Sequence, residues 1–344
     1  MNSSTEPRPA HWPTQEGVLA LGDFPLLKGG VLRDARLCWR THGTLSPARD
    51  NVIVYPTSYA AQTPELTWLI GPDGILDPGR WFIVQPDMFG NGLSSAPSNT
   101  EDYPSLVTAW DNVQAQKRLL AETFGVQGVA CVYGWSMGAQ QAYHWAAAFP
   151  GDVARIIAVC GSARTSVHNQ VFLRSLLAIL EAAPEYLGNG RFSATPAKAL
   201  RAFARVYAGW ALSQDFYRAG LHLTAEPDLE AFLQHQWDAR WGARNAANLY
   251  AQAQCWHAGD ISDNPLYRGD LAKALGAIQA RVLLMPGETD LYFRVADNEA
   301  EMRHLRSAVL KPIPSMHGHR AGNPLGIPKD IDFLRRETRA WLDA

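Results

Sequence analysis

The chain lacks several features that would place it in a specialised class of protein. No apolar run in its 344 residues is long enough to cross a membrane, and no block of Lys or Arg is present. With 31 basic and 33 acidic residues, the formal net charge is −2. We therefore expect no nucleic-acid partner and no membrane partner. A hydrophobic content of 47% against 19% charged residues excludes a disordered or fibrous chain.

Cysteine is also scarce, and metal-binding motifs are absent. The four cysteines form no CxxC pair, and no HExxH motif occurs, so we expect neither a metal nor a tightly bound cofactor. Cys131 and Cys160 lie inside apolar runs and are predicted to be small core residues. The first residues are polar and interrupted by proline, unlike a secretory signal, so we expect a cytoplasmic protein.

Short apolar runs, each ended by Gly, Pro or Asp, predict strands that are covered on both faces. They are residues 51–55, 81–85, 128–133, 154–160 and 281–285, with a weaker one at 307–314. Helical stretches such as residues 108–124 and 137–149 lie between them. This alternation predicts a doubly wound α/β architecture with a mostly parallel sheet. Residues 17–44 predict further strands at the sheet edge.

One long segment interrupts the alternation. Residues 165–274 show no convincing strand and are rich in Ala, Leu and aromatic residues, which predicts an inserted helical lid. Residues 1–164 and 275–344 would then form the two parts of one α/β core. Large aromatic residues are mostly core material, so we expect the tryptophans of the insertion to pack its helices together. They are Trp210, Trp237, Trp241 and Trp256.

The strongest chemical motif is Gly-Trp-Ser-Met-Gly at residues 134–138, between the predicted strand 128–133 and the helix that follows. A Gly-x-Ser-x-Gly turn at a strand-to-helix junction holds its serine in a strained conformation, which the flanking glycines make sterically feasible. The turn presents the hydroxyl at the carboxyl ends of the strands, where open α/β sheets bind ligands. Ser136 is therefore the candidate nucleophile, and the contrasting interpretation is a structural Gly-rich turn.

A serine nucleophile requires a base and an acid that orients the base, and in this fold they follow in the order Ser, Asp or Glu, His. Asp290 lies in the loop after the strand 281–285, and we favour it over Glu288 because it lies deeper in the loop. His319 lies in a loop near the end of the chain, and His317 is the alternative base.

Amide donors for a developing oxyanion are expected at two places. One is the residue after the nucleophile, Met137, and the other is in the loop after residues 51–55, where Thr57 and Ser58 are the candidates. Trp135, Ser58 and Arg320 are candidate substrate contacts.

At these residues the chain resembles the homoserine O-acetyltransferase family of the α/β-hydrolase fold, from about residue 17 to the C-terminus. The segment 134–138 is similar to the family's Gly-Gly-Ser-Met-Gly, Thr-Asp-Leu-Tyr-Phe at 289–293 to Ser-Asp-x-Leu-Phe, and Gly-His-Arg at 318–320 to Gly-His-Asp. The resemblance implies that Ser136, Asp290 and His319 form a catalytic triad. It also favours the Thr57 amide for the oxyanion hole, and it implies that the insertion is a lid that can support a homodimer.

The chain departs from the family directly after the base. The family's aspartate there helps to hold the amino group of homoserine, whereas this chain has Arg320. A cation would repel an ammonium group, so homoserine is not the expected substrate. Arg320 could bind a carboxylate or phosphate, or anchor its loop by a salt bridge.

Three functions remain open at this point. The leading hypothesis is a hydrolase that cleaves a small ester, or an amide, through an acyl-Ser136 intermediate. The alternative is an O-acyltransferase that uses acetyl-CoA or another acyl-CoA as co-substrate. The third is a binding protein with a hydrolase fold and no catalytic activity. In each case the expected partner is a small acyl molecule.

Overall fold

The computed structural model describes residues 12–344, so the polar N-terminal segment considered above lies, except for its last residues, outside the described part of the chain. An eight-stranded sheet in this part has the strand order β1-β2-β4-β3-β5-β6-β9-β10. The strands are β1 (Thr14–Pro25), β2 (Val31–His42), β3 (Val52–Val54), β4 (Phe82–Pro86), β5 (Cys131–Trp135), β6 (Arg155–Val159), β9 (Arg281–Met285) and β10 (Ala308–Leu310). The pairs β1–β2 and β2–β4 are antiparallel and every other pair is parallel. The predicted α/β architecture with extra strands at one edge is therefore confirmed.

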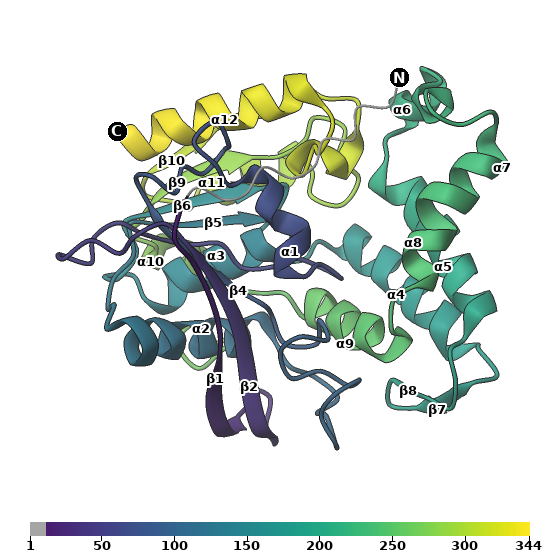
Figure 1. Ribbon diagram of the computed structural model, residues 1–344, viewed down its shortest axis with the longest axis horizontal. Helices are drawn as coiled ribbons and strands as arrows, with labels where there is room; N and C mark the ends of the chain where they lie inside the picture. Colours follow the sequence, from purple (N-terminus) through teal and green to yellow (C-terminus); the bar gives the residue numbers. More distant parts are fainter. Residues whose placement is uncertain (1–11) are drawn as a thin grey trace.

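Helices cover both faces of the sheet (Figure 1). One face carries α2 (Ala109–Phe124), α3 (Met137–Ala148), α10 (Leu271–Ala277) and α11 (Val295–Met302), and the other carries α1 (Thr63–Leu66) and α12 (Pro328–Asp343). Alternate residues of one strand point to opposite faces. Val132 belongs to the hydrophobic cluster with α2 and α3, whereas Cys131 and Tyr133 belong to the cluster with α12. Burial on both faces explains the continuous apolar runs.

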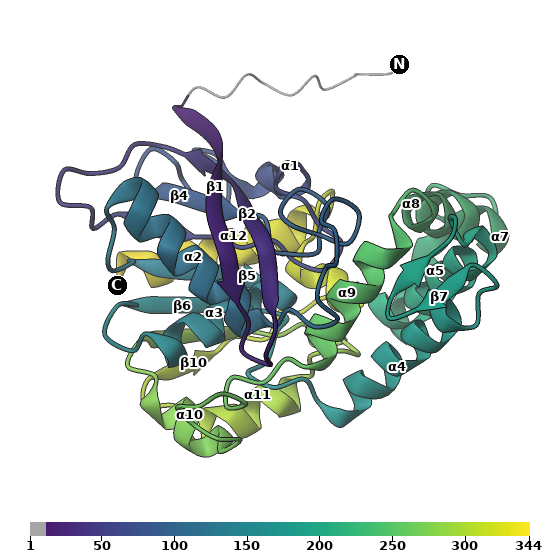
Figure 2. The same ribbon diagram turned by 90° about the horizontal axis from the view of Figure 1, so that it is seen from below.

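The insertion forms a separate helical layer at one end of the molecule (Figures 1 and 2). It contains α4 (Val167–Glu181), α5 (Ala197–Ala211), α6 (Gln214–Arg218), α7 (Leu229–Phe232), a π-helical segment (Leu233–Asp238), α8 (Ala239–Gly242) and α9 (Ala246–His257). The prediction that the insertion has no strand was wrong, because β7 (Tyr186–Gly188) and β8 (Arg191–Phe192) form a hairpin. Its turn uses the left-handed region at Gly188, Asn189 and Gly190, where Gly and Asn are the favoured residues.

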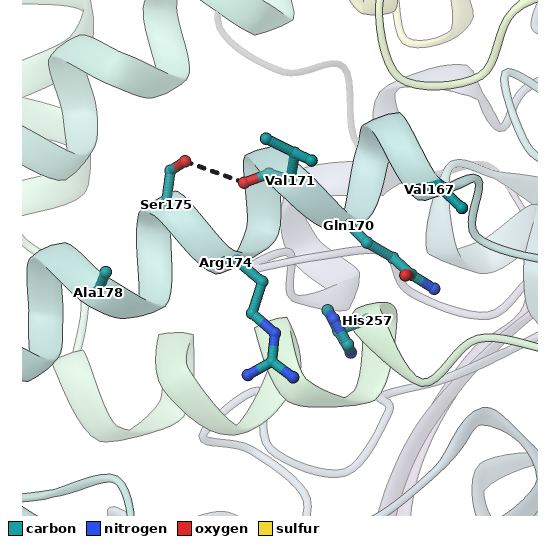
Figure 3. Close-up of a pocket in the computed structure, with 7 residues that line it drawn as sticks. All are labelled: Val167, Gln170, Val171, Arg174, Ser175, Ala178 and His257. Atoms are coloured by element: carbon teal, nitrogen blue, oxygen red, sulfur yellow. Dashed lines mark hydrogen bonds between the residues drawn. The ribbon is translucent and has the colours of Figure 1, made fainter.

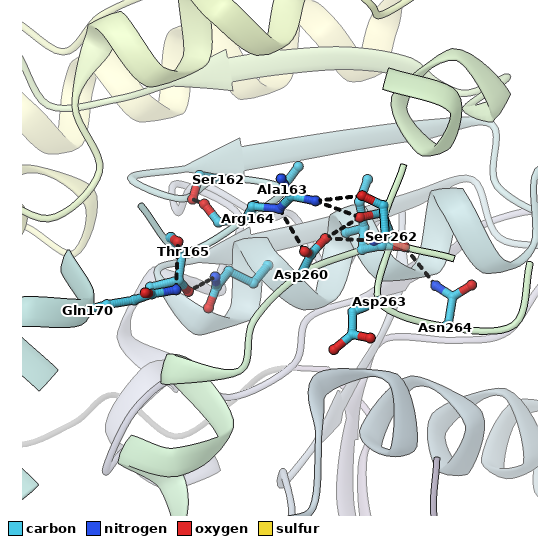
Figure 4. A network of polar contacts seen from close by, with 12 residues as sticks. Ser162, Ala163, Arg164, Thr165, Gln170, Asp260, Ser262, Asp263 and Asn264 are labelled. Atoms are coloured by element: carbon cyan, nitrogen blue, oxygen red, sulfur yellow. Dashed lines mark hydrogen bonds and ion pairs between the residues drawn. The ribbon is translucent and has the colours of Figure 1, made fainter. Parts of the chain in front are cut away.

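The insertion leaves and re-enters the core through two segments that lie side by side (Figure 4). The amide of Thr165 donates to Gly259, and the Arg164 Nε atom lies 2.6 Å from a carboxylate oxygen of Asp260. The chain thus returns to the core near residue 260, before the boundary expected at residue 274. The reason is that α10 buries Ala274 and Leu275 against the sheet cluster.

The tryptophans of the insertion pack as expected. Trp237, Trp241 and Trp256 are buried in the hydrophobic cluster of the insertion, and Trp210 is half-buried against it. The same cluster includes Met137 and Tyr292 from the core. The lid therefore packs on the carboxyl ends of the strands, where the candidate nucleophile lies.

Candidate active site

Ser136 lies on the sharp turn between β5 and α3, as predicted. Its backbone has φ 58° and ψ −124°, a strained conformation for a residue with a side chain. A Cβ on Gly134 would lie 2.1 Å from the carbonyl oxygen of Gly138, and a Cβ on Gly138 would lie 2.9 Å from the carbonyl oxygen of Pro56. Only glycine fits at either position, so steric contact explains the Gly-x-Ser-x-Gly pattern.

The structure brings Ser136, His319 and Asp290 into one hydrogen-bonded chain. His319 Nε2 lies 2.8 Å from Ser136 Oγ, and His319 Nδ1 lies 2.7 Å from Asp290 Oδ2. All three residues are buried, with exposures of 2%, 4% and 4%. In this arrangement the imidazole can take a proton from the hydroxyl while the carboxylate stabilises the positive charge that results.

The alternative acid and base, Glu288 and His317, take no part in these hydrogen bonds. Glu288 is exposed and has no side-chain hydrogen bond or ion pair among the described residues. His317 Nδ1 lies 3.3 Å from Ser315 Oγ and 3.7 Å from a carboxylate oxygen of Asp330. The geometry therefore distinguishes His319 from His317 and Asp290 from Glu288, a choice that the residues alone had left open.

Asp290 is held in place by its own loop. Its Oδ1 atom accepts hydrogen bonds from the amides of Tyr292 at 2.7 Å and Phe293 at 3.3 Å. These two bonds leave Oδ2 for His319. Because the side chain is completely buried, hydrogen bonds replace the water that an ionised carboxylate would otherwise require.

Cys160 is a neighbour of this chain that the sequence reasoning treated only as a core residue. One ligand-type atom each from Cys160, Asp290 and His319 lies within 4.8 Å of the others. Burial, followed by the charge of Asp290, raises the pKa of the Cys160 thiol well above its ordinary value. The thiol therefore stays protonated and is a poor nucleophile. The sequence held one indication of this position: Cys160 ends the predicted strand 154–160, and open α/β sheets bind ligands at the carboxyl ends of their strands.

Aromatic rings enclose the imidazole of His319. Trp135 stacks on it with centroids 5.2 Å apart, Tyr292 meets it edge-on at 4.9 Å, and Phe293 lies at 5.6 Å. A Cβ on Gly322 would lie 2.4 Å from the Trp135 ring, so the backbone approaches the indole closely. The structure thus places Trp135, a predicted substrate contact, against His319.

The oxyanion donors require one correction. The Thr57 amide donates to the carbonyl of Pro86 at 3.2 Å, because the pairing of β3 with β4 continues for one more residue pair. The Thr57 amide is therefore not free to bind an oxyanion, contrary to the expectation from the sequence. The Ser58 amide has no hydrogen bond to a described residue. Met137 opens α3, where a helix leaves its amides without internal partners.

Arg320 has no anchoring partner among the residues that the structure describes. Its side chain makes no hydrogen bond or ion pair within residues 12–344, so the salt-bridge interpretation finds no support there. Arg320 is exposed to solvent, while partial desolvation and, secondly, the charge of Arg240 lower the pKa of its guanidinium.

Comparison with known proteins shows the family. Residues 68–319 match a family described as "alpha/beta hydrolase fold". The chain therefore belongs to the α/β hydrolase fold family. The ethyl acetate hydrolase of Pseudomonas veronii is 33% identical over 310 residues, which cover 88% of each chain. A probable esterase of Corynebacterium glutamicum is 35% identical over 318 residues, covering 87% of this chain and 88% of the relative.

Solved structures agree with this relationship. The acetyl esterase MekB superposes with a TM-score of 0.90 at 31% identity and covers 96% of this chain and 97% of its own. An acetylester hydrolase from Corynebacterium glutamicum gives 0.87 at 32% identity, with 94% and 96% covered. The homoserine O-succinyltransferase of Methylibium petroleiphilum is a more distant relative, at 28% identity. Among the described residues, no helix combines the length and apolar character needed to span a membrane.

Proposed function

We propose that this α/β hydrolase cleaves small carboxylic esters through an acyl-Ser136 intermediate. The observation that carries the proposal is the buried chain of hydrogen bonds, 2.8 Å from Ser136 Oγ to His319 Nε2 and 2.7 Å from His319 Nδ1 to Asp290 Oδ2. Ethyl acetate hydrolase and acetyl esterase activities in relatives that share about a third of the sequence support the substrate class.

In the first half of the reaction, His319 Nε2 removes the proton from Ser136 Oγ as the oxygen attacks the ester carbonyl. The negative charge that develops on the carbonyl oxygen is stabilised by the amides of Met137 and Ser58. His319 then gives its proton to the departing alcohol, and the acyl group stays on Ser136. In the second half, His319 removes a proton from water as the water oxygen attacks the acyl-enzyme. The bond from the acyl carbon to Ser136 Oγ then breaks, His319 returns the proton to Oγ, and the acid is released.

Asp290 and Trp135 keep the imidazole ready for both proton transfers. The carboxylate fixes the proton of the neutral ring on Nδ1, so that Nε2 faces Ser136 with its lone pair. The stacked indole restricts rotation of the ring. Preorganisation of this kind lowers the cost of reaching the transition state.

Acyl transfer from an acyl-CoA to an alcohol is the second candidate, since relatives at 26–28% identity are homoserine O-succinyltransferases. The two reactions share the acyl-enzyme and differ in the acceptor. This chain has Arg320 where the homoserine O-acetyltransferase family has an aspartate, and this cation disfavours homoserine as the acceptor. Purified enzyme should release acid from a simple acetate ester at a rate that added homoserine does not change. Formation of O-acetylhomoserine would favour the transferase.

A homodimer through the lid is a further part of the proposal. The outer face of α4 exposes Val167 by 77% and Val171 by 55%. Both line a surface groove with Arg174 and His257 (Figure 3). Exposed apolar side chains that gather on one face are typical of protein contacts. Light scattering after gel filtration should give twice the chain mass, and Val171→Glu should give the monomer. A monomeric wild-type protein contradicts this part.

Labelling by a fluorophosphonate tests the nucleophile. The reagent should modify wild-type protein once, and Ser136→Ala should remove the label. Cys160→Ala is the matched control, because it alters the buried neighbour of the base and leaves the hydroxyl intact. If the label persists in Ser136→Ala, or is lost only in Cys160→Ala, the proposed mechanism is wrong.

A further inference from the structure

The turn that begins at Ser58, one of the two proposed oxyanion donors, has a strained backbone. Residues 58–61 form a β-turn in which the Ala61 amide donates a hydrogen bond to the Ser58 carbonyl at 3.1 Å. The third residue of this turn, Ala60, has φ 56°, a left-handed conformation that glycine adopts readily and alanine does not. Strain of this kind persists only where surrounding contacts hold the backbone.

A side chain of the lid supplies such a contact. Gln252 lies on α9, and its Oε1 atom accepts a hydrogen bond from the Ala60 amide at 2.7 Å. The Gln252 side chain is 1% exposed, and a hydrogen bond in a buried environment is electrostatically stronger than the same bond in water. Gln252 therefore holds the one residue of the turn that has a left-handed backbone.

The lid also packs closely against the rest of this turn. A Cβ on Gly90 would lie 3.1 Å from Gln252 Cγ, so a glycine in a core loop lets the Gln252 side chain pass. The Tyr59 hydroxyl donates a hydrogen bond to the Leu249 carbonyl of α9 at 3.0 Å. The Tyr59 ring lies 5.7 Å from the Trp256 ring, also of α9, between centroids. Both central residues of the turn are thus bound by one lid helix.

The residue before the turn is fixed by the core instead. The Thr57 carbonyl accepts a hydrogen bond from Gln141 Nε2 at 3.0 Å, and Gln141 lies on α3, the helix that follows the nucleophile. The Ser58 amide makes no hydrogen bond with a described residue. The peptide group that carries this amide is therefore fixed by the core at one end and leads into a lid-held turn at the other.

We propose that Gln252 is a positioning residue, which holds the 58–61 turn so that the Ser58 amide points at the oxyanion, and that lid contact is required for a complete oxyanion hole. This inference rests on the ester hydrolysis proposed above, with the Ser58 amide as a donor. The negative charge on the carbonyl oxygen develops in the transition state, so a misplaced donor weakens binding mainly there. Loss of the Gln252 contact should therefore act on kcat and leave KM nearly unchanged.

Two replacements of Gln252 test the inference. Gln252→Leu removes the acceptor at similar volume and should lower kcat for ethyl acetate by about tenfold or more, with KM within about twofold. Gln252→Glu should keep most of the wild-type kcat, because a carboxyl oxygen can accept the same amide. If Gln252→Leu does not fold, Gln252→Met, which also lacks an oxygen acceptor, takes its place. A side chain that only packs the lid would change Tm and leave kcat of the folded protein unaltered.

Ala60→Gly tests whether Gln252 acts through the strained turn. Glycine adopts φ 56° without steric cost, so the turn should depend less on its contact with the lid. Gln252→Leu should therefore lower kcat by a smaller factor in the Ala60→Gly background than in the wild-type background. Equal factors in the two backgrounds would contradict action through the turn.

Asn248→Ala is the matched control, because Asn248 lies one helical turn earlier on α9 and makes a lid–core contact that does not involve the 58–61 turn. Its Nδ2 atom donates to Ser98 Oγ at 2.8 Å. Asn248→Ala should leave kcat unchanged. If Gln252→Leu keeps the wild-type kcat, raises KM alone, or has no more effect than Asn248→Ala, the positioning role is refuted while ester hydrolysis stands. If the wild-type protein cleaves no ester, the proposed function itself has failed.

Discussion

Replacing Asp290 by Asn should nearly abolish activity without unfolding the protein. Asp290 Oδ1 accepts two backbone amides, at 2.7 Å and 3.3 Å. An asparagine that keeps its carbonyl oxygen there must turn its NH₂ group toward His319 Nδ1. That nitrogen then has to accept a hydrogen bond, so the ring proton moves to Nε2. The imidazole would present a proton to Ser136 instead of a lone pair, and it could no longer act as a base.

The wrong tautomer, together with the loss of the charge that stabilises the imidazolium, should lower kcat by roughly 10³–10⁴-fold. At about 1.4 kcal/mol for each factor of ten, this is about 4–6 kcal/mol of transition-state stabilisation. A pH-stat assay with ethyl acetate measures the rate, and circular dichroism and thermal unfolding confirm that the variant is folded. Glu288→Gln is the control, since Glu288 is exposed, and it should keep the wild-type rate. An Asp290→Asn variant within tenfold of wild type would refute the assigned role of the carboxylate.

Three further predictions concern other parts of the molecule. Trp135→Leu should lower kcat by about tenfold with little change in KM in steady-state assays, since the indole contacts the base; a change in KM alone would instead assign Trp135 to the substrate. Gly134→Ala should lower the free energy of unfolding by roughly 2 kcal/mol or more in denaturant titrations, because its Cβ would lie 2.1 Å from a backbone oxygen. Gly276→Ala, where the nearest atom is 3.8 Å away, should be neutral, and equal effects at the two sites would contradict the steric argument. Burial raises the pKa of Glu301 from 4.5 to about 7, so the folded state holds a proton that the unfolded chain releases. Its contribution to stability is therefore complete below pH 4.5 and is lost as the pH rises to about 7. Glu301→Gln should therefore weaken the dependence of Tm on pH between 4.5 and about 7. If Tm changes with pH as steeply as in the wild type, another group is responsible.

Most of the core could be predicted because its signals are local. The strand 281–285 was placed at its observed bounds, and the Gly-x-Ser-x-Gly turn was found at the expected junction. Both follow from side chains close together in the sequence, namely apolar residues covered on two faces and glycines that avoid a backbone clash. The helical insertion was recognised for the same reason, since a hundred residues without a strand pattern are a local property of composition.

The errors arose where the outcome depends on contacts between distant residues. Whether the Thr57 amide is free depends on how far β3 pairs with β4, and its acceptor, Pro86, lies on another strand. Cys160 gained its place beside Asp290 only through the packing of β6 against β9. That Arg320 finds no partner within residues 12–344 likewise depends on every residue that packs around its loop. No pattern within a short window of sequence contains this information.

The most direct test of the central claim is to trap the acyl-enzyme during turnover of an acetate ester. Protein quenched in acid within the first turnovers should carry the mass of one acetyl group, and peptide mapping should place that group on Ser136. In His319→Ala the acetylated species should be absent, because the hydroxyl is no longer activated. An acetyl group on Cys160 or on any other residue, or ester cleavage that continues in Ser136→Ala at the wild-type rate, would contradict the account.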